Sequence, residues 1–135
     1  TATVNLVFKS GALCTLNVSD TIVGPWSYEL TAGENPVYPI TDQSAYFIGG
    51  TNGSLQFPNI KNWHYPKDRS WWNKISFKVD KIKKDTNTLV NQIDHFSDVV
   101  LKRSKPKVKG VDGLISLKIF NAIKKSAING KKIKV

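Results

Sequence analysis

Hydrophobic and polar residues alternate along much of the first sixty positions, which is the period of a half-buried β-strand. The opening stretch TATVNLVFKS places Val4, Leu6 and Phe8 on one face, with polar residues between them. ALCTLNV alternates less regularly, and GPWSYEL, AYFIGG and SLQF are further short apolar stretches. Runs rich in Gly, Pro and Asn, such as TAGENP and GGTNGS, separate them. This spacing predicts a β-sandwich or a β-barrel.

The most regular alternation lies in NKISFKVDKIKK, residues 73–84. Its apolar side consists of Ile75, Phe77, Val79 and Ile82, with lysine, serine and aspartate between them. The pattern predicts a strand whose apolar side lies in the core. Replacing a core phenylalanine such as Phe77 by alanine is expected to cost about 3 to 5 kcal/mol.

The period changes in DTNTLVNQIDHFSDVVLKR, where apolar residues recur at intervals of three and four. This is the spacing of one helix face. Asp85 or Thr86 is suited to the N-cap, and Lys102 and Arg103 favour the negative end of the helix dipole. The sequence therefore predicts one α-helix at about residues 86–102.

The tail alternates again in LISLKIF and KKIKV, and its dipeptides DG and NG are strong hairpin-turn signals. We expect these two stretches to form closing strands. NAIKKSA, which lies between them, could instead form one helical turn. No repeat, low-complexity tract or domain linker interrupts the chain. The prediction is a mainly β fold, an antiparallel β-sandwich with one α-helix, built as a single domain over residues 1–135.

Composition is that of an ordinary globular protein, with 40% hydrophobic and 22% charged residues among 135. No apolar run approaches the roughly 20 residues of a membrane-spanning helix, and no signal peptide is visible. A secreted or a cytosolic protein is therefore expected.

Charge is distributed unevenly along the chain. Residues 1–60 contain one base against four acids, a net charge of −3, whereas residues 61–135 contain nineteen bases against six acids, a net charge of +13. Such asymmetry points to an anionic partner, a nucleic acid or a membrane surface, although a generally solvated basic surface fits it equally well. The stretch KRSKPKVK is expected to form an exposed basic patch at Lys102, Arg103, Lys105, Lys107 and Lys109.

Catalytic motifs are absent from the sequence. GGTNGS lacks the lysine, the preceding buried strand and the following helix of a phosphate-binding loop. The single cysteine, Cys14, rules out an internal disulfide and fits a small buried hydrophobe better than a reactive thiol. The only histidines, His64 and His95, form no metal-ligand spacing with it. We therefore expect no enzymatic activity, no metal and no cofactor.

Three of the four tryptophans lie in NWHYPKDRSWWNK. Adjacent residues of a strand point to opposite faces, so Trp71 and Trp72 cannot both enter one core. We predict that Trp63, Tyr65 and at least one of Trp71 and Trp72 are exposed. Aromatic rings beside lysine and arginine suit lipid headgroups, quaternary ammonium groups, sugars or nucleic-acid bases. The structural alternative is that all three indoles pack within the core.

The segment GGTNGSLQFPNIKNWHYPKDRSWWNKISFKV resembles the actinoporin cytolysins, whose β-sandwich the fungal fruit-body lectins share. The resemblance rests on a Gly-rich strand, a proline, NW, WW and a strand of the form xKIxF. The family's tyrosines on the following helix are replaced here by His95 and Phe96, and its amphipathic N-terminal segment has no counterpart. The resemblance implies a lipid-headgroup site at the matching positions, Gln56, Pro58, Trp63, His64, Trp71 and Trp72. Tyr65 and Arg69 of the same segment are added to it.

These features lead to one expected function, a non-enzymatic protein of cytolysin or toxin type that binds membrane lipid headgroups, choline or anionic lipids among them. Peripheral membrane association and oligomerisation on the membrane are expected with it. A lectin of similar fold that binds glycans and a basic module that binds nucleic acid are the alternatives.

Overall fold

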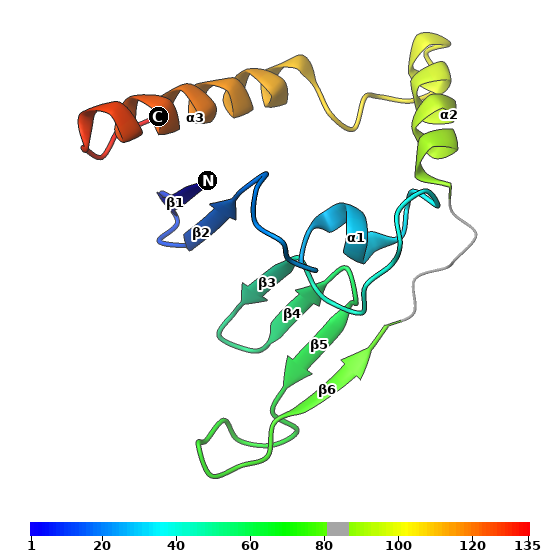
Figure 1. The fold of residues 1–135 in the computed structure, drawn as a ribbon. Helices are drawn as coiled ribbons and strands as arrows, with labels where there is room; N and C mark the ends of the chain where they lie inside the picture. Colours follow the sequence, from blue (N-terminus) through cyan, green and yellow to red (C-terminus); the bar gives the residue numbers. More distant parts are fainter. Residues whose placement is uncertain (81–86) are drawn as a thin grey trace. The chain divides into compact units, whose positions relative to one another are not determined.

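The computed structural model describes residues 1–80 and 87–135 (Figure 1). Its strands form two antiparallel sheets, one of two strands and one of four in the order β3-β4-β5-β6. The elements in chain order are β1 (Ala2–Val7), β2 (Leu13–Val18), α1 (Tyr28–Ala32), β3 (Tyr46–Gly49), β4 (Ser54–Phe57), β5 (Lys61–His64), β6 (Ser76–Val79), α2 (Thr88–Val100) and α3 (Gly110–Asn129).

The chain divides into two compact units. The first contains Thr1–Ile22 and Gln92–Val135, and so holds the β1–β2 hairpin, most of α2 and all of α3. The second contains Val23–Asn91 and holds α1 and the four-stranded sheet. The single domain expected over residues 1–135 stays a prediction.

The β1–β2 hairpin follows the alternation of its sequence. On its polar face, the Thr3 hydroxyl donates a hydrogen bond to the side-chain oxygen of Asn17 at 3.2 Å. The connecting turn includes Gly11, whose φ of 88° lies in the left-handed region that favours glycine. The other face carries four partly buried apolar side chains, Val4, Leu6, Cys14 and Leu16.

Helix α2 lies within the predicted range of residues 86–102. Its N-cap is Asn87, whose side-chain oxygen accepts hydrogen bonds from the backbone N–H groups of Leu89 and Val90 at 3.1 and 3.2 Å. Asparagine is among the residues preferred at this position, because its oxygen satisfies N–H groups that have no partner within the helix. Three residues used in the predictions lie outside the described parts of the chain: Ile82, Asp85 and Thr86.

The predicted closing strands are wrong, because Gly110–Asn129 form helix α3. The dipeptides that indicated hairpin turns are helix-end signals here. In DG, the Asp112 carboxylate accepts a hydrogen bond from the Lys109 N–H at 2.7 Å beside the start of the helix. In NG, Gly130 has a left-handed φ of 63°, and its N–H bonds the Ser126 carbonyl at 2.9 Å, which ends the helix.

The four-stranded sheet is an antiparallel meander built from short strands. The turn between β3 and β4 closes through a hydrogen bond from the Gly50 N–H to the Gly53 carbonyl at 2.8 Å. Residues 65–75 join β5 to β6. Helix α1 begins after the N-cap Ser27 and ends at Gly33, which has a left-handed φ of 65°.

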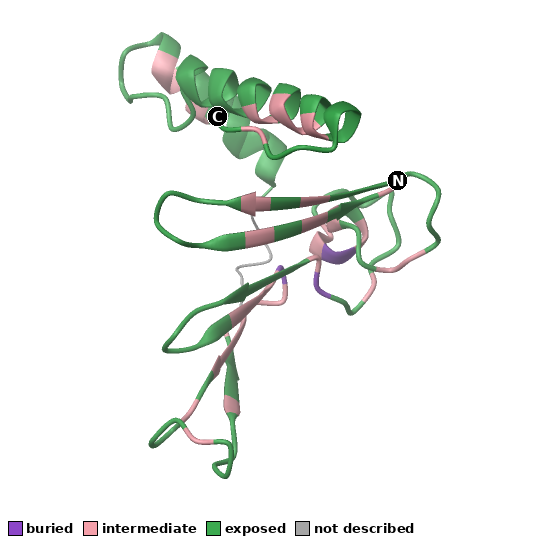
Figure 2. Ribbon diagram, turned by 90° about the vertical axis from the view of Figure 1, so that its left-hand side faces the viewer, coloured by how far each residue is buried: buried purple, intermediate pink, exposed green. Residues whose placement is uncertain are grey.

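No apolar side chain in the described parts of the chain is fully buried, and Pro58 is the one apolar residue there that counts as buried. Figure 2 shows most of the four-stranded sheet as exposed or intermediate. The core positions predicted on β6 are therefore wrong: Ile75, Phe77 and Val79 are exposed by 43%, 50% and 50%. Regular alternation correctly indicated a strand, but it does not determine whether the apolar side of that strand is covered.

The fold is α/β, with two small sheets and three helices among the described residues, and not a mainly β sandwich with one helix. The sandwich prediction required the tail to return to strands. Helix α3 removes those strands, and the six strands that remain are divided between the two units.

Phe77→Ala should lower the free energy of unfolding by about 1 to 2 kcal/mol, less than the 3 to 5 kcal/mol of an enclosed phenylalanine. Phe77 is already 50% exposed, and its ring packs against the Trp63 ring at 4.8 Å between centroids. Urea unfolding checks this, with Phe47→Ala as control because Phe47 is 70% exposed. A loss of 3 kcal/mol or more for Phe77→Ala would show that the ring is enclosed.

Candidate functional site

The cross-strand register of β3–β6 sorts the side chains of this sheet onto two faces. Residues opposite each other in neighbouring strands point the same way, and successive residues of one strand point to opposite faces. One face, here the covered face, carries α1 at one end and holds Tyr46, Ile48, Leu55, Phe57, Asn62, His64, Ser76 and Lys78. The other, the open face, holds Phe47, Ser54, Gln56, Lys61, Trp63, Phe77 and Val79.

Helix α1 closes one end of the covered face through aromatic contacts. The Tyr28 ring lies 6.0 Å from the rings of both Tyr46 and Phe57, and it is inclined by only 15° to the latter. The Tyr28 hydroxyl donates a hydrogen bond to the Glu34 carboxylate at 2.8 Å. This bond raises the pKa of Tyr28, and burial and the charge of Glu34 raise it further.

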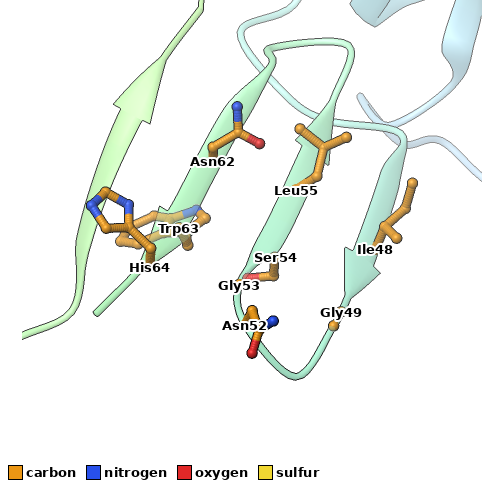
Figure 3. A pocket seen from close by; sticks show the side chains of 10 residues that line it. Ile48, Gly49, Asn52, Gly53, Ser54, Leu55, Asn62, Trp63 and His64 are labelled. Carbon is orange, nitrogen blue, oxygen red and sulfur yellow. The ribbon is translucent and has the colours of Figure 1, made fainter. Parts of the chain in front are cut away.

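A shallow hollow of about 380 Å³ opens at the other end of the covered face (Figure 3). Ile48 and Leu55 supply its apolar floor. Asn62 and His64, two residues apart on β5, line it from the same side, and Asn52 of the β3–β4 turn adds a second amide. This polar hollow therefore places amide and imidazole groups around an apolar floor.

A charged pair holds Asn62 in place beside the polar hollow. The Asn62 amide donates a hydrogen bond to one Asp80 oxygen at 2.8 Å, and the Lys78 ammonium lies 2.8 Å from the other oxygen. The hydrogen bond from Lys78 and its positive charge lower the pKa of Asp80, and the hydrogen bond from Asn62 lowers it further. Asp80 in turn raises the pKa of Lys78 by the same hydrogen bond and charge. Both groups are ionised at neutral pH, and together they contribute no net charge.

The β3–β4 turn approaches β5 so closely that only glycine fits at position 53. A Cβ atom there would lie 2.6 Å from the Trp63 carbonyl oxygen, which is closer than real Cβ contacts. The missing side chain allows the turn and β5 to form two walls of the same hollow.

The Trp63 side chain contacts several neighbours on the open face. Its ring packs against Phe77, and the Lys61 ammonium lies 5.8 Å from the Trp63 ring and 4.7 Å from the Phe77 ring. A second hollow of about 390 Å³ has Phe47 and Gln56 among its lining residues, next to Trp63. Within the described residues, the Trp63 indole nitrogen is buried without a hydrogen-bond partner.

Residues 65–75 form an aromatic loop with a defined conformation. Its Arg69 side chain donates a hydrogen bond to the Thr51 carbonyl at 3.0 Å, which ties the loop to the β3–β4 turn. The Asn73 amide donates to the Asp68 carbonyl at 2.8 Å. The indoles of Trp71 and Trp72 are 97% and 94% exposed.

The site residues predicted from the sequence lie on different faces and at different ends of the four-stranded sheet. Trp63 and His64 both line the polar hollow, and Gln56 joins Trp63 at the hollow of the open face. Pro58 is buried and follows β4, at the end of the sheet away from the aromatic loop. The prediction that at least one of the paired tryptophans is exposed is confirmed for both. The predicted exposure of Trp63 and Tyr65 is wrong, because both residues are partly buried. A ligand role for these residues stays a prediction.

The predicted basic patch lies in the first unit, in the segment between α2 and α3. Arg103 forms an ion pair with Asp98 at 3.9 Å, and the Lys107 N–H donates a hydrogen bond to His95 Nε2 at 3.2 Å. An exposed ion pair of this kind adds little to stability. The five cations are all exposed, and a role in binding an anion stays a prediction for Lys102, Arg103, Lys105, Lys107 and Lys109.

Sequence reasoning missed Asn52, Asn62, Ile48 and Leu55 as site residues. A signal for Asn62 was present in KNWH, because the two-residue period places it on the same face as His64. No comparable signal marks Asn52, which reaches the polar hollow only because the β3–β4 turn folds against β5.

The described residues do not fit a bound redox group. No three His, Cys, Asp or Glu side chains among them are grouped to hold a metal ion. Cys14 is a single free thiol and cannot cycle as a dithiol pair. The Gly-rich turn 49–53 joins two antiparallel strands, so it lacks the helix N-terminus that binds a dinucleotide phosphate.

Over its whole length, residues 1–135, the chain matches the GFO/IDH/MocA family model, described as oxidoreductase family, C-terminal alpha/beta domain. The chain belongs to this family. No curated protein and no solved structure matches it. The α/β character of a GFO/IDH/MocA C-terminal domain agrees with the sheets and helices described above.

Family membership corrects the expected identity and function. The chain is not a member of the actinoporin cytolysins or the fungal fruit-body lectins, and the expected function as a membrane-binding cytolysin, toxin or lectin is wrong. The resemblance covered about thirty residues, a Gly-rich hairpin followed by an aromatic loop, and such a local motif does not determine the fold around it. Lipid, glycan and nucleic-acid partners, and the localisation, stay predictions. Outside residues 81–86, the chain has no helix of the length and apolarity needed to cross a membrane.

Asp80→Asn should lower the melting temperature slightly at neutral pH, because it removes the carboxylate that binds Asn62 and Lys78. The pKa of Asp80 is lowered in the folded state, so its contribution is present above the ordinary aspartate pKa of about 3.9 and is lost as pH falls through the lower folded-state value. Thermal unfolding between pH 7 and pH 2 should show the difference between the two proteins disappear in acid. A difference that is constant over this range would contradict the assignment.

Proposed function

We propose that this chain forms the substrate-side domain of an oxidoreductase and binds a hydroxyl-bearing substrate in the polar hollow. The redox group is held by another part of the enzyme. The observation that carries the proposal is the polar hollow itself, where Asn62 and His64 face an apolar floor in a domain of an oxidoreductase family.

The chemistry of the polar hollow favours a hydroxylated ligand. A hydroxyl group both donates and accepts hydrogen bonds, and so do the side chains of asparagine and neutral histidine. Ile48 and Leu55 match the carbon side of such a molecule. The ionised Lys78–Asp80 pair beside Asn62 is neutral as a whole, which favours an uncharged substrate over an ion. A hollow of about 380 Å³ is within the range of small-molecule sites.

The role of this domain is to bind and orient the substrate. Positioning alone accounts for a large share of enzymatic rate enhancement. Because the described residues offer no place for a redox group, we propose that the isolated chain carries out no electron transfer by itself.

Titration of the ¹⁵N-labelled chain with sorbitol and glucose, followed by NMR, tests this function. The backbone signals of Asn52, Asn62 and His64 should shift with millimolar affinity. Asn62→Ala and His64→Ala should each weaken binding about tenfold, the effect of one lost hydrogen bond of about 1.4 kcal/mol.

The matched control is His95→Ala, which removes the other histidine from a helix of the first unit and should leave the affinity unchanged. Shifts confined to the open face, or equal affinity in all variants, would overturn the assignment of the polar hollow. The absence of any shift with either compound would refute the hydroxylated substrate class.

A further inference from the structure

The aromatic loop, residues 65–75, presents two almost fully exposed indoles, Trp71 and Trp72, and none of its residues lines the polar hollow. We propose that the aromatic loop of one copy docks onto the acidic segment, residues 23–42, of a second copy, so that the chain associates head to tail. This proposal is independent of the substrate proposed above.

The aromatic loop already has a defined conformation in the free chain. The Arg69–Thr51 and Asn73–Asp68 hydrogen bonds fix its path, so little further ordering is needed on binding. Trp71 and Trp72 both project into water, and tryptophan and arginine are the residue types that most often dominate interface energies. The loop contains three bases, Lys67, Arg69 and Lys74, against one acid, Asp68.

The acidic segment is complementary in both charge and apolarity. It contains Glu29, Glu34 and Asp42 and no base. Between these acids it exposes apolar side chains, with Val37 and Ile40 exposed by 80% and 71%. Positive charge with tryptophan on one surface therefore matches negative charge with aliphatic groups on the other, the arrangement that steers association and fixes register.

The two surfaces lie at opposite ends of the same sheet. The acidic segment includes α1, which contacts Tyr46 and Phe57. The aromatic loop begins after His64, beside the pair that His64 forms with Ser76 at the far end of β5 and β6. They therefore cannot meet within one copy, and their complementarity is available only to a second molecule. A contact between two different surfaces of one chain is heterologous, and it forms rings or chains instead of a symmetric pair.

The size of the loop predicts a weak and salt-sensitive association. Two indoles bury roughly 150 to 250 Å² each, which is below the roughly 800 Å² per partner of a standard interface. Self-association is therefore expected with a dissociation constant of roughly 10 to 100 μM. It should weaken with added salt, because the charges on both surfaces are exposed.

Sedimentation equilibrium of the full chain up to 300 μM tests the proposal, with circular dichroism to verify that each variant is folded. Trp71→Ala with Trp72→Ala removes the indoles of the loop surface, and Glu29→Gln with Asp42→Asn removes two of the three negative charges of the acidic surface with little change of shape. Each double variant alone should associate at least tenfold more weakly than the wild type. An equimolar mixture of the two should form a one-to-one complex, since each retains the surface that the other has lost.

The control is Phe96→Ala, which removes a 67% exposed aromatic ring from α2 and should leave self-association unchanged. A wild-type chain that is monomeric at 300 μM would overturn the proposal. So would an associating wild type whose two variants form no mixed complex, because that result assigns the contact to a symmetric surface. Loss of association in Phe96→Ala would assign it to α2 and would also overturn the proposal.

Discussion

The second unit depends on the register in which β4 pairs with β5. Leu55 lies opposite Asn62, and Ser54 lies opposite Trp63. Because side chains alternate along a strand, a slip of one residue would exchange the positions of Asn62 and Trp63 on the two faces. The glycine at position 53 permits the close approach of the turn to β5, and the hydrogen bond from Asn62 to Asp80 adds a polar contact that the slipped strand would lose.

This register separates two kinds of surface on one small sheet. The covered face keeps hydrogen-bonding groups next to an apolar floor, which suits a small polar molecule. The aromatic loop begins directly after β5 and presents bulky indoles to water, which suits a protein surface. The four residues of β5 position both the polar hollow and the aromatic loop. The substrate-binding and docking roles proposed for this oxidoreductase domain therefore both depend on the pairing of β5.

The sequence predicted local structure better than it predicted assembly. Alternation located β1, β2, β3, β4 and β6, and the period of three and four located α2, because both patterns reflect local backbone geometry. It missed β5, and the strand predicted in GPWSYEL is wrong, because Tyr28–Ala32 form α1. The tail was misread because LISLKIF alternates over a few residues while DG and NG act as helix ends, a distinction that only the twenty-residue length of α3 makes clear. His64 was included among the candidate residues, but Asn52 was not, because its place in the polar hollow results from a contact between β5 and a turn ten residues earlier.

The most direct test of the account is the pairing of β4 with β5 in solution, measured by NMR distance restraints on the labelled chain. The observed register predicts cross-strand NOEs that link Leu55 to Asn62 and Ser54 to Trp63, and ring contacts between Trp63 and Phe77. Backbone NOEs that place Leu55 directly opposite Trp63 would show the strand slipped by one residue and would remove the polar hollow on which the proposed function rests.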